Sequence, residues 1–328
     1  MIIKKISLAN FRCYSQYHLD FKERTTQILG ENGSGKTTVL EGIYEAMRGK
    51  SFRSVDTEIM KREEEFYRVE LEYCDGGKTV VTYDGKKKQF LAGDKKYGRL
   101  PKKYRFPVVL FLPEDLNLIT ASPAHKRRYF DEMLAQLSER YAKTLSHYNK
   151  ALKQRNELLK REYVSGEDMF SWNVLLANYG CEIRRLRIEL VKQINEKITE
   201  VYRSIAENKD EVAINYIGPE RIDEGEFLAE LERNFIVDRA VGHTMVGVQK
   251  DNYEFIFNNS LASGSASRGE TRSIIIALKF IEAEMILKII GKRPVVLLDD
   301  VFSELDATRR EALVKNFKEN QIVLTSVK

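Results

Sequence analysis

The stretch GENGSGKTT, residues 30–38, decides the fold of this chain. Four of its residues have the spacing GxxxxGK[ST] of a phosphate-binding loop: Gly30, Gly35, Lys36 and Thr37. The glycines of such a loop let backbone N–H groups close around a phosphate, the lysine reaches the β- and γ-phosphates, and the hydroxyl ligates Mg²⁺. A glycine turn before a helix would explain Gly30, but not a GKT at this offset. We therefore expect a site for a nucleoside triphosphate with Mg²⁺.

The residues on either side of the loop fit the strand, loop and helix order that the motif requires. Thr25–Leu29 reads as a short apolar strand, and 39–47 reads as an amphipathic helix. The pattern therefore predicts an α/β domain.

A second half of the site is expected near the other end of the chain, in KRPVVLLDDVFSELDATRREAL, residues 292–313. Val295–Leu298 has the pattern of a fully buried parallel strand, and Asp299 and Asp300 follow it. Carboxylates at the carboxyl end of a central strand face the crevice where α/β sheets bind ligands. Asp299 is expected to hold Mg²⁺, and Asp300 to act as general base on the attacking water. A capped turn is the alternative for the two aspartates taken alone.

Composition sets wide limits on the class of protein. The 328 residues are 43% hydrophobic and 31% charged, as in a folded globular protein, and the net charge of +5 permits a polyanionic partner without requiring one. The three cysteines, Cys13, Cys74 and Cys181, are far apart, which suggests neither a disulfide framework nor a zinc site. The N-terminal sequence has no apolar run of signal-peptide length, so we expect a cytoplasmic protein.

About 260 residues separate the phosphate loop from the acidic strand, so an insertion is expected. Apolar residues recur at helical spacing in two runs, on either side of Ser165 and Gly166. The first run comprises Phe130, Leu134, Leu137, Tyr141, Leu145, Tyr148, Leu152 and Leu159; the second comprises Trp172, Leu176, Tyr179, Ile183, Leu186, Leu190, Ile194, Ile198, Val201 and Ile205. We predict an antiparallel helical hairpin, packed as a lobe at 124–208, within a discontinuous ATPase domain of 1–123 and 209–328.

The stretch LASGSASRGETRSIIIALKF, residues 261–280, places a serine- and glycine-rich loop before an apolar helix. Ser267 is a candidate N-cap for that helix. Such a loop also presents unpaired N–H groups and the positive end of a helix dipole, which together can bind an anion. We expect this loop to cover a phosphate that the first two motifs leave exposed.

Several stretches resemble known ATPases. The strand that ends in two aspartates, SELD at 303–306 and SRGE at 267–270 are similar to the ABC-type ATPases, although the match to the signature LSGGQ is loose. Closer similarity to the RecF family of bacterial DNA replication and repair proteins extends along nearly the whole chain. It lies in NFRCY (10–14), GENGSGKTTVLEGIY (30–44), GKSFRS (49–54), FLPEDLNLITASPAHKRRYFDEML (111–134), KALKQRNELL (150–159) and LLDDVFSELDATRR (297–310).

The resemblance implies an ABC-type P-loop ATPase head, built from both chain ends, with an inserted α-helical lobe. It implies that ATP and Mg²⁺ are bound between two subunits. The implied nucleotide-binding residues are Gly30, Glu31, Asn32, Gly33, Ser34, Gly35, Lys36, Thr37 and Thr38, with Arg12 and Arg53 nearby. Ser267 and Gly269 would be contributed by the partner subunit. The implied catalytic residues are Lys36, Asp300 and Ser267, and the implied metal ligands are Thr37 and Asp299.

Some positions depart from the family pattern. Asp300 stands where many ABC-type relatives have glutamate, and its shorter side chain suits slow turnover. No glutamine is evident as an extra Mg²⁺ ligand, so Glu114 is an open candidate. The family usually continues for one or two strands beyond QIVLTSVK, and Thr325 or Ser326 is the nearest polar group there to a sensor residue.

The implied function is that of an ATP-dependent recombination mediator. Its ATP-bound homodimer would bind duplex DNA at gaps and single-strand junctions and load RecA with RecR and RecO, and slow, DNA-stimulated hydrolysis would release it. The alternative is an ATPase subunit of another SMC-like or transport complex. Candidate DNA contacts are the lysines at 86–88, 95 and 96 in a hairpin-like region and HKRR at 125–128, although solvated surface charges would look the same.

Overall fold

The computed structural model describes residues 2–219 and 221–327, and the chain forms two compact units. The first unit combines the two ends of the chain, residues 1–116 and 282–328, and the second comprises residues 117–281. Because the first unit contains the phosphate loop and the acidic strand, it is the ATPase unit of the prediction. We call the second unit the helical unit.

A four-stranded parallel sheet forms one half of the ATPase unit. Its order is β3 (Thr25–Leu29), β13 (Ile322–Ser326), β12 (Val295–Leu298) and β8 (Val108–Phe111). All four residues of β12 are buried, which is the pattern of a central parallel strand. The predicted strands 25–29 and 295–298 are confirmed at both ends. Since the strands are parallel, their carboxyl ends meet at one edge of the sheet.

A six-stranded antiparallel sheet forms the other half of this unit. Its order is β2 (Tyr14–Asp20), β1 (Ile3–Phe11), β4 (Tyr67–Tyr73), β5 (Lys78–Tyr83), β6 (Lys88–Ala92) and β7 (Lys95–Tyr97). Helix α1 (Lys36–Arg48) packs against strands of both sheets and is buried along nearly its whole length. At Gly42 a Cβ atom would lie 2.7 Å from the Leu8 side chain, so any larger residue where α1 packs on β1 would force Leu8 to shift.

Shorter elements complete the ATPase unit. They are α2 (Asp56–Ile59), α11 (Ala307–Asn316) and the 3₁₀ turns Lys102–Tyr104, Pro113–Asn117 and Val301–Glu304. The turn Pro113–Asn117 directly follows β8 and leads into the helical unit.

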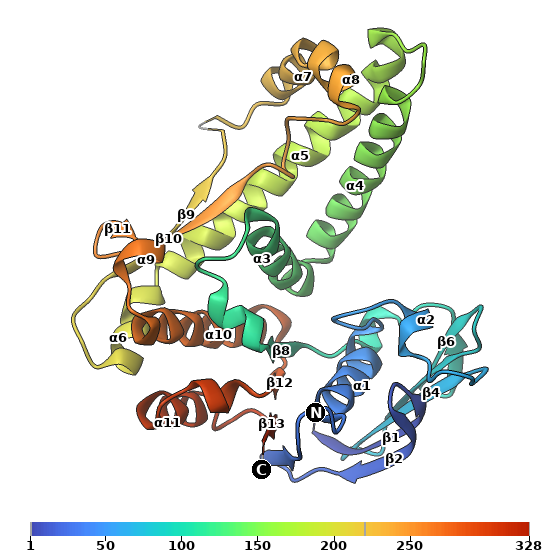
Figure 1. Cartoon of the computed structure of the whole chain (residues 1–328), viewed down its shortest axis with the longest axis vertical. Helices are drawn as coiled ribbons and strands as arrows, with labels where there is room; N and C mark the ends of the chain where they lie inside the picture. The colour runs from blue at the N-terminus through green and yellow to red at the C-terminus, as the bar shows by residue number, and fades with distance from the viewer. Residues whose placement is uncertain (1, 220, 328) are drawn as a thin grey trace. The chain divides into compact units, whose positions relative to one another are not determined.

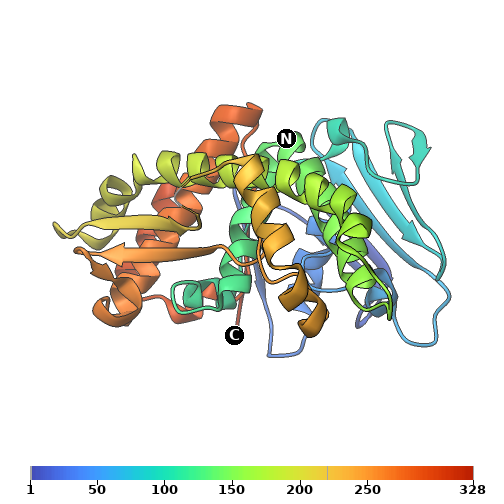
Figure 2. The same ribbon diagram turned by 90° about the horizontal axis from the view of Figure 1, so that it is seen from above.

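The helical unit is built on two long helices, α4 (Glu139–Leu159) and α5 (Gly166–Asn195), which lie side by side (Figure 1). Helix α5 also packs against α7 and β9, so the hairpin belongs to a packed lobe, as predicted. The other helices are α3 (Pro123–Leu137), α6 (Ile198–Ala206), α7 (Glu224–Arg233), α8 (Phe235–Val241), α9 (Ala262–Ser265) and α10 (Arg268–Ile290). Three antiparallel strands, β9 (Val212–Ile217), β10 (Asn252–Phe257) and β11 (Ser260–Leu261), form a small sheet, and Figure 2 shows β9 beside β10.

The structure corrects the prediction of two uninterrupted helices. The first breaks at Ser138, whose extended backbone ends α3 and whose side chain accepts the Tyr141 N–H to cap α4. The second breaks at 196–197, where α5 gives way to α6. The compact units also meet at different residues from the predicted domains, because the small sheet and most of α10 group with the helical unit. None of the described helices is both long and apolar enough to cross a lipid bilayer.

Candidate nucleotide-binding site

The phosphate loop connects β3 to α1, and its glycines have conformations that other residues rarely adopt. Gly33 and Gly35 have φ angles of +80° and +92°, in the left-handed region. A Cβ atom at Gly35 would also lie 2.7 Å from the Cys13 Sγ and from the Tyr14 hydroxyl oxygen. The Tyr14 hydroxyl donates to the Ser34 carbonyl at 3.0 Å, which ties β2 to the loop. Glycine is therefore required at 35 by both conformation and space.

The loop presents a row of unused backbone donors. Among the described residues, no acceptor pairs with the backbone N–H groups of Asn32, Gly33, Gly35, Lys36 and Thr37. The last two open α1, where the positive end of the helix dipole adds to their attraction for an anion. These donors are what a bound phosphate chain requires.

Lys36 is held within the loop. Its ammonium group donates to the carbonyl oxygens of Gly30 and Glu31 at 3.0 and 3.1 Å, and it is 3.7 Å from an Asp300 carboxylate oxygen. The side chain is only 5% exposed. The structure therefore places one nearly buried positive charge among the free N–H groups of the loop.

The carboxyl edge of the parallel sheet joins the two motifs. The Thr37 hydroxyl donates to an Asp299 carboxylate oxygen at 2.9 Å, although the residues are 262 positions apart. The Thr325 hydroxyl at the end of β13 donates to the same oxygen at 2.9 Å and accepts the Asp300 N–H at 2.8 Å. Burial raises the pKa of Asp299 above its ordinary value, against the hydrogen bonds from Thr325 and Thr37, which lower it.

Asp300 and Glu114 lie at the same edge. Asp300 has a left-handed backbone, with φ at 48°, and its buried Oδ1 has no hydrogen-bond partner. Glu114 is exposed and follows β8, whose Phe111 carbonyl accepts the Asp299 N–H at 3.0 Å. The Thr37 hydroxyl and the buried Asp299 carboxylate are oxygen ligands of the kind that fits a Mg²⁺ ion, and the unpartnered Asp300 Oδ1 leaves an acceptor for a water molecule.

Arg12 and Arg53 share one partner that the sequence did not indicate. Both donate to the carboxylate of Glu41, a fully buried residue of α1, with the closest contacts at 2.8 and 2.7 Å. Arg53 also lies 3.4 Å from the Thr38 hydroxyl, next to the loop. Burial opposes ionisation of Glu41, but the hydrogen bonds from Arg12, Arg53 and Ser51 prevail and lower its pKa. The structure thus places both predicted arginines in contact with Glu41 of α1, the helix that follows the phosphate loop.

Replacing Glu41 with glutamine is expected to lower the free energy of unfolding by about 2 kcal/mol, since a buried ion pair loses one partner. The pKa of Glu41 is lower in the folded state. Its stabilisation is therefore present above the pKa of an exposed glutamate, about 4.3, and is lost as the pH falls through the folded value. Urea unfolding at pH 7 and pH 3.5 measures this, and Glu23→Gln, on an exposed loop, is the control. If the free energy of unfolding of Glu41→Gln differed from that of the unchanged protein by the same amount at both pH values, the ion pairs of Glu41 would not be the source of the stabilisation.

Ser267 and Gly269 belong to the helical unit, whereas the phosphate loop belongs to the ATPase unit. Ser267 caps α10 as predicted: its hydroxyl accepts the Glu270 N–H at 3.3 Å, and its own N–H donates to the Glu270 carboxylate at 2.6 Å. This is a capping box. Ser267 is exposed and Gly269 is partly exposed, so the turn is not covered by the fold of its own unit.

The predicted basic patches divide into exposed and paired residues. Lys86, Lys87, Lys95 and Lys96 are exposed around the β5–β6 and β6–β7 turns, and Arg128 is exposed on α3. Lys88 instead pairs with buried Glu45 and with Asp56, Arg127 donates to the Asp251 carbonyl, and Lys126 is 9% exposed. Lys88 and Arg127 therefore make contacts within their own unit, and Lys126 is largely buried.

Comparisons with known proteins agree with this geometry. A family model described as an AAA ATPase domain matches residues 1–163. The DNA replication and repair protein RecF of Clostridium acetobutylicum is 32% identical over 336 residues, which cover 99% of this chain and 92% of that protein. The RecF of Alkaliphilus oremlandii is also 32% identical, over 99% of this chain and 93% of that protein. The chain belongs to the RecF family.

Solved structures confirm the predicted ABC-type head with its helical lobe. A structure described as the recombination mediator protein RecF-ATP in the RecFOR pathway covers 100% of this chain and 92% of that chain, with a TM-score of 0.87 and 27% identity. An SMC head bound to the C-terminal winged-helix domain of ScpA, at 14% identity and a TM-score of 0.54, shares the fold. This chain is therefore a RecF-family member with a P-loop ATPase fold, the class of DNA replication, recombination and repair proteins.

Proposed function

We propose that this RecF-family protein is an ATP-dependent recombination mediator. The observation that carries the proposal is the contact between Thr37 and Asp299, at 2.9 Å, because it unites the phosphate loop with the acidic strand in one site. The free loop N–H groups, Lys36 and the carboxylates around them form the donor set that a triphosphate with Mg²⁺ requires. The solved structure described as RecF-ATP supports ATP as the nucleotide.

Each residue of the site has a proposed role. The loop residues 30–38 hold the phosphates through backbone N–H groups, and Lys36 balances the charge of the terminal ones. Thr37 and Asp299 are the proposed ligands of Mg²⁺, which when bound neutralises charge that develops on the phosphate oxygens. Asp300, with its free Oδ1, orients the attacking water. Through Glu41, Arg12 and Arg53 position α1 and lie close to the nucleotide.

Ser267 and Gly269 are proposed to complete the site of a second subunit. The loop offers its N–H groups to one side of the phosphates, so the terminal phosphoryl group needs donors on its other side. The exposed capping turn at the start of α10 supplies a hydroxyl and the positive end of a helix dipole. ATP bound in this way joins two copies of the chain, and its hydrolysis separates them.

In the cell this dimer is proposed to act in the cytoplasm on duplex DNA at gaps and single-strand junctions, with RecR and RecO, to load RecA. The exposed lysines at 86, 87, 95 and 96 offer charge for DNA phosphates. Hydrolysis is proposed to be slow and stimulated by DNA, so that it limits the lifetime of the dimer. Membership of the RecF family favours this function over that of a transporter ATPase.

Molecular mass in solution tests the proposal. With Mg²⁺ and ATP, light scattering is expected to show a monomer-to-dimer shift, and DNA binding is expected to weaken as salt rises. Ser267→Arg should leave ATP binding by the monomer unchanged but shift the dimer equilibrium by at least about a hundredfold, since a bulky cation replaces the capping hydroxyl at the interface. Binding of a fluorescent ATP analogue and scattering measure the two properties separately.

A matched control is Ser263→Arg, an exposed serine of α9 four positions before the turn. This variant should dimerise more readily than Ser267→Arg. If Ser267→Arg dimerises with ATP as the unchanged protein does, Ser267 does not act on a partner's nucleotide.

A further inference from the structure

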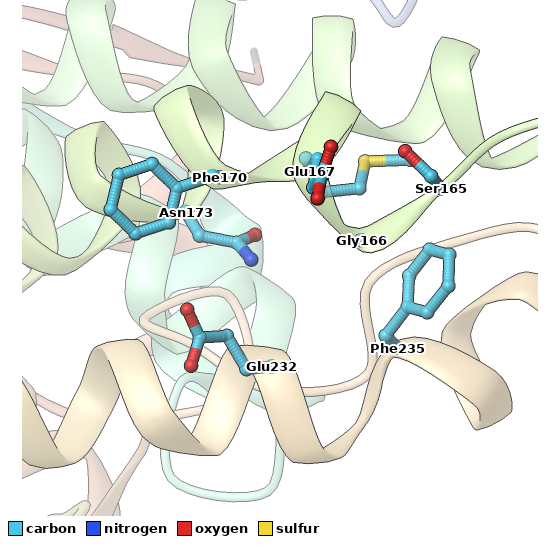
Figure 3. Close-up of a pocket in the computed structure, with 8 residues that line it drawn as sticks. Ser165, Gly166, Glu167, Phe170, Asn173, Glu232 and Phe235 are labelled. Carbon is cyan, nitrogen blue, oxygen red and sulfur yellow. The ribbon is translucent and has the colours of Figure 1, made fainter.

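A pocket of about 710 Å³ lies within the helical unit, between the start of α5 and the α7–α8 pair (Figure 3). All the residues that line it fall between 165 and 235, so it is separate from the phosphate loop, the acidic strand and the Ser267 turn. Its volume is within the range of pockets that bind ligands, about 300–1,000 Å³. The function proposed above does not use it.

The pocket has an apolar lining. Met169, fully buried on α5, forms part of its wall, and the rings of Phe170 on α5 and Phe235 at the start of α8 border it (Figure 3). Phe170 is 53% exposed. The next residue after Phe235, Ile236, is 78% exposed, and Tyr163 in the loop before α5 is 84% exposed. Tyr163 and Ile236 are close in sequence to the lining residues Ser165 and Phe235. An exposed ring such as that of Phe170 at the border of a hollow is typical of a surface that another apolar group covers.

The charges of the pocket have one sign. Glu167 and Glu232 line it from α5 and α7, both are exposed, and neither forms an ion pair among the described residues. No lysine or arginine is among the lining residues. A cationic group of an occupant would therefore meet two unpaired carboxylates, whereas a nucleic-acid phosphate would be repelled by them.

A buried polar group gives the pocket a fixed hydrogen-bond donor. Asn173 is 2% exposed, and its side-chain oxygen accepts from the Arg155 Nε at 2.7 Å. Arg155 is itself held by Asp238 and Thr244, each at 2.7 Å. The amide NH₂ of Asn173 has no acceptor among the described residues, and in Figure 3 the side chain points into the same space as Glu232. The Arg155 contact fixes which way this donor points.

We propose that this pocket binds a short linear segment of a partner protein that carries a lysine or arginine beside an aromatic or large aliphatic residue. The apolar side chain enters the pocket and packs on Met169 between Phe170 and Phe235. The basic side chain pairs with Glu167 and Glu232, and a backbone carbonyl of the segment accepts from the Asn173 amide. This combination of one apolar anchor, one complementary charge and one backbone hydrogen bond is a common basis of peptide recognition.

A displayed library of random twelve-residue peptides tests the proposal on the full chain. Peptides that bind the double variant Glu167→Lys, Glu232→Lys are removed first, and the remaining peptides are selected on the unchanged protein. We expect the selected peptides to carry lysine or arginine within a few positions of an aromatic or aliphatic residue. A labelled synthetic copy of one such peptide then serves for anisotropy measurements. The double variant Glu167→Gln, Glu232→Gln should weaken binding of this peptide about tenfold, and so should the single variant Phe170→Ala.

The control double variant Glu196→Gln, Glu200→Gln removes two exposed carboxylates at the other end of the hairpin and should bind the peptide normally. ATP binding should be the same in all variants, which separates failure here from failure of the proposed function. Enrichment of acidic peptides would overturn the proposal. It would also be overturned if the pocket variants bound every enriched peptide as tightly as the unchanged protein does. Two further results would overturn it. If Phe170→Ala lost self-association in the absence of peptide, the occupant would be a second copy of this chain. If a single-stranded oligonucleotide competed with the peptide, the pocket would bind nucleic acid.

Discussion

Replacing Lys36 with methionine is expected to lower the rate of ATP hydrolysis about 10³-fold. Methionine nearly matches lysine in length, so the loop keeps its shape while losing its one buried positive charge, which lies 3.0 Å from the Gly30 carbonyl and 3.7 Å from Asp300. The terminal phosphates then meet the carboxylates of Asp299 and Asp300 with less compensating charge. Release of inorganic phosphate in single-turnover conditions measures the rate, and a fluorescent ATP analogue measures binding.

The matched control is Lys22→Met, which removes an exposed lysine between β2 and β3 in the same unit. It should hydrolyse ATP at the unchanged rate. If Lys36→Met kept a rate within tenfold of the unchanged protein, the loop would not be the site of hydrolysis, whatever its resemblance to a phosphate loop.

The parts of the site that the sequence predicted are those with a local signal. Val295–Leu298 is an apolar run that ends at two aspartates, Thr25–Leu29 directly precedes the phosphate loop, and both strands begin and end where predicted. The sequence predicted that the two motifs share one site, but it predicted no strand order, and the structure places β13 between β3 and β12. Thr325 was only the nearest polar group at the end of the chain, but the structure places its hydroxyl between Asp299 and Asp300.

The Glu41 contacts had no such signal. Arg12 and Arg53 lie 29 and 12 positions from Glu41, and only the packing of α1 on β1 and the following loop brings the three together. A glutamate on an amphipathic helix ordinarily reads as solvent-exposed. Its burial depends on two arginines that no helical or strand periodicity connects to it.

The helix breaks were missed for a different reason. Leu134, Leu137 and Tyr141 keep helical spacing across Ser138, because α3 and α4 both turn an apolar face to the core. Periodicity reports which residues are buried, and it does not detect a change of direction between two helices that bury the same side. At the first break, the capping Ser138 was the only local sign, and at the second, Lys197 precedes α6 with no side-chain cap.

Removal of the Arg155 side-chain charge is expected to have the largest effect on stability. Arg155 and Asp238 are both fully buried and form an ion pair at 2.7 Å, and Arg155 also donates to the Leu231 carbonyl at 3.2 Å. The ion pair joins α4 to α8, and the hydrogen bond to Leu231 joins α4 to α7. Arg155→Met leaves a buried carboxylate without its partner, so the free energy of unfolding should fall by about 4 kcal/mol.

A second ion pair, at the end of the same helix, provides the control. Glu157 and Lys160 pair at 3.1 Å, but both are more than half exposed, and Lys160→Met should change the free energy of unfolding by less than about 0.5 kcal/mol. The double variant Arg155→Met, Asp238→Leu should recover part of the loss, because it removes the stranded charge as well. Trp172, the one tryptophan of the chain, lies on α5 beside Asn173, so its fluorescence during urea unfolding reports on this unit. Equal effects of the buried and exposed variants would mean that the pair contributes little, and that packing of apolar side chains alone holds α7 and α8 on the hairpin.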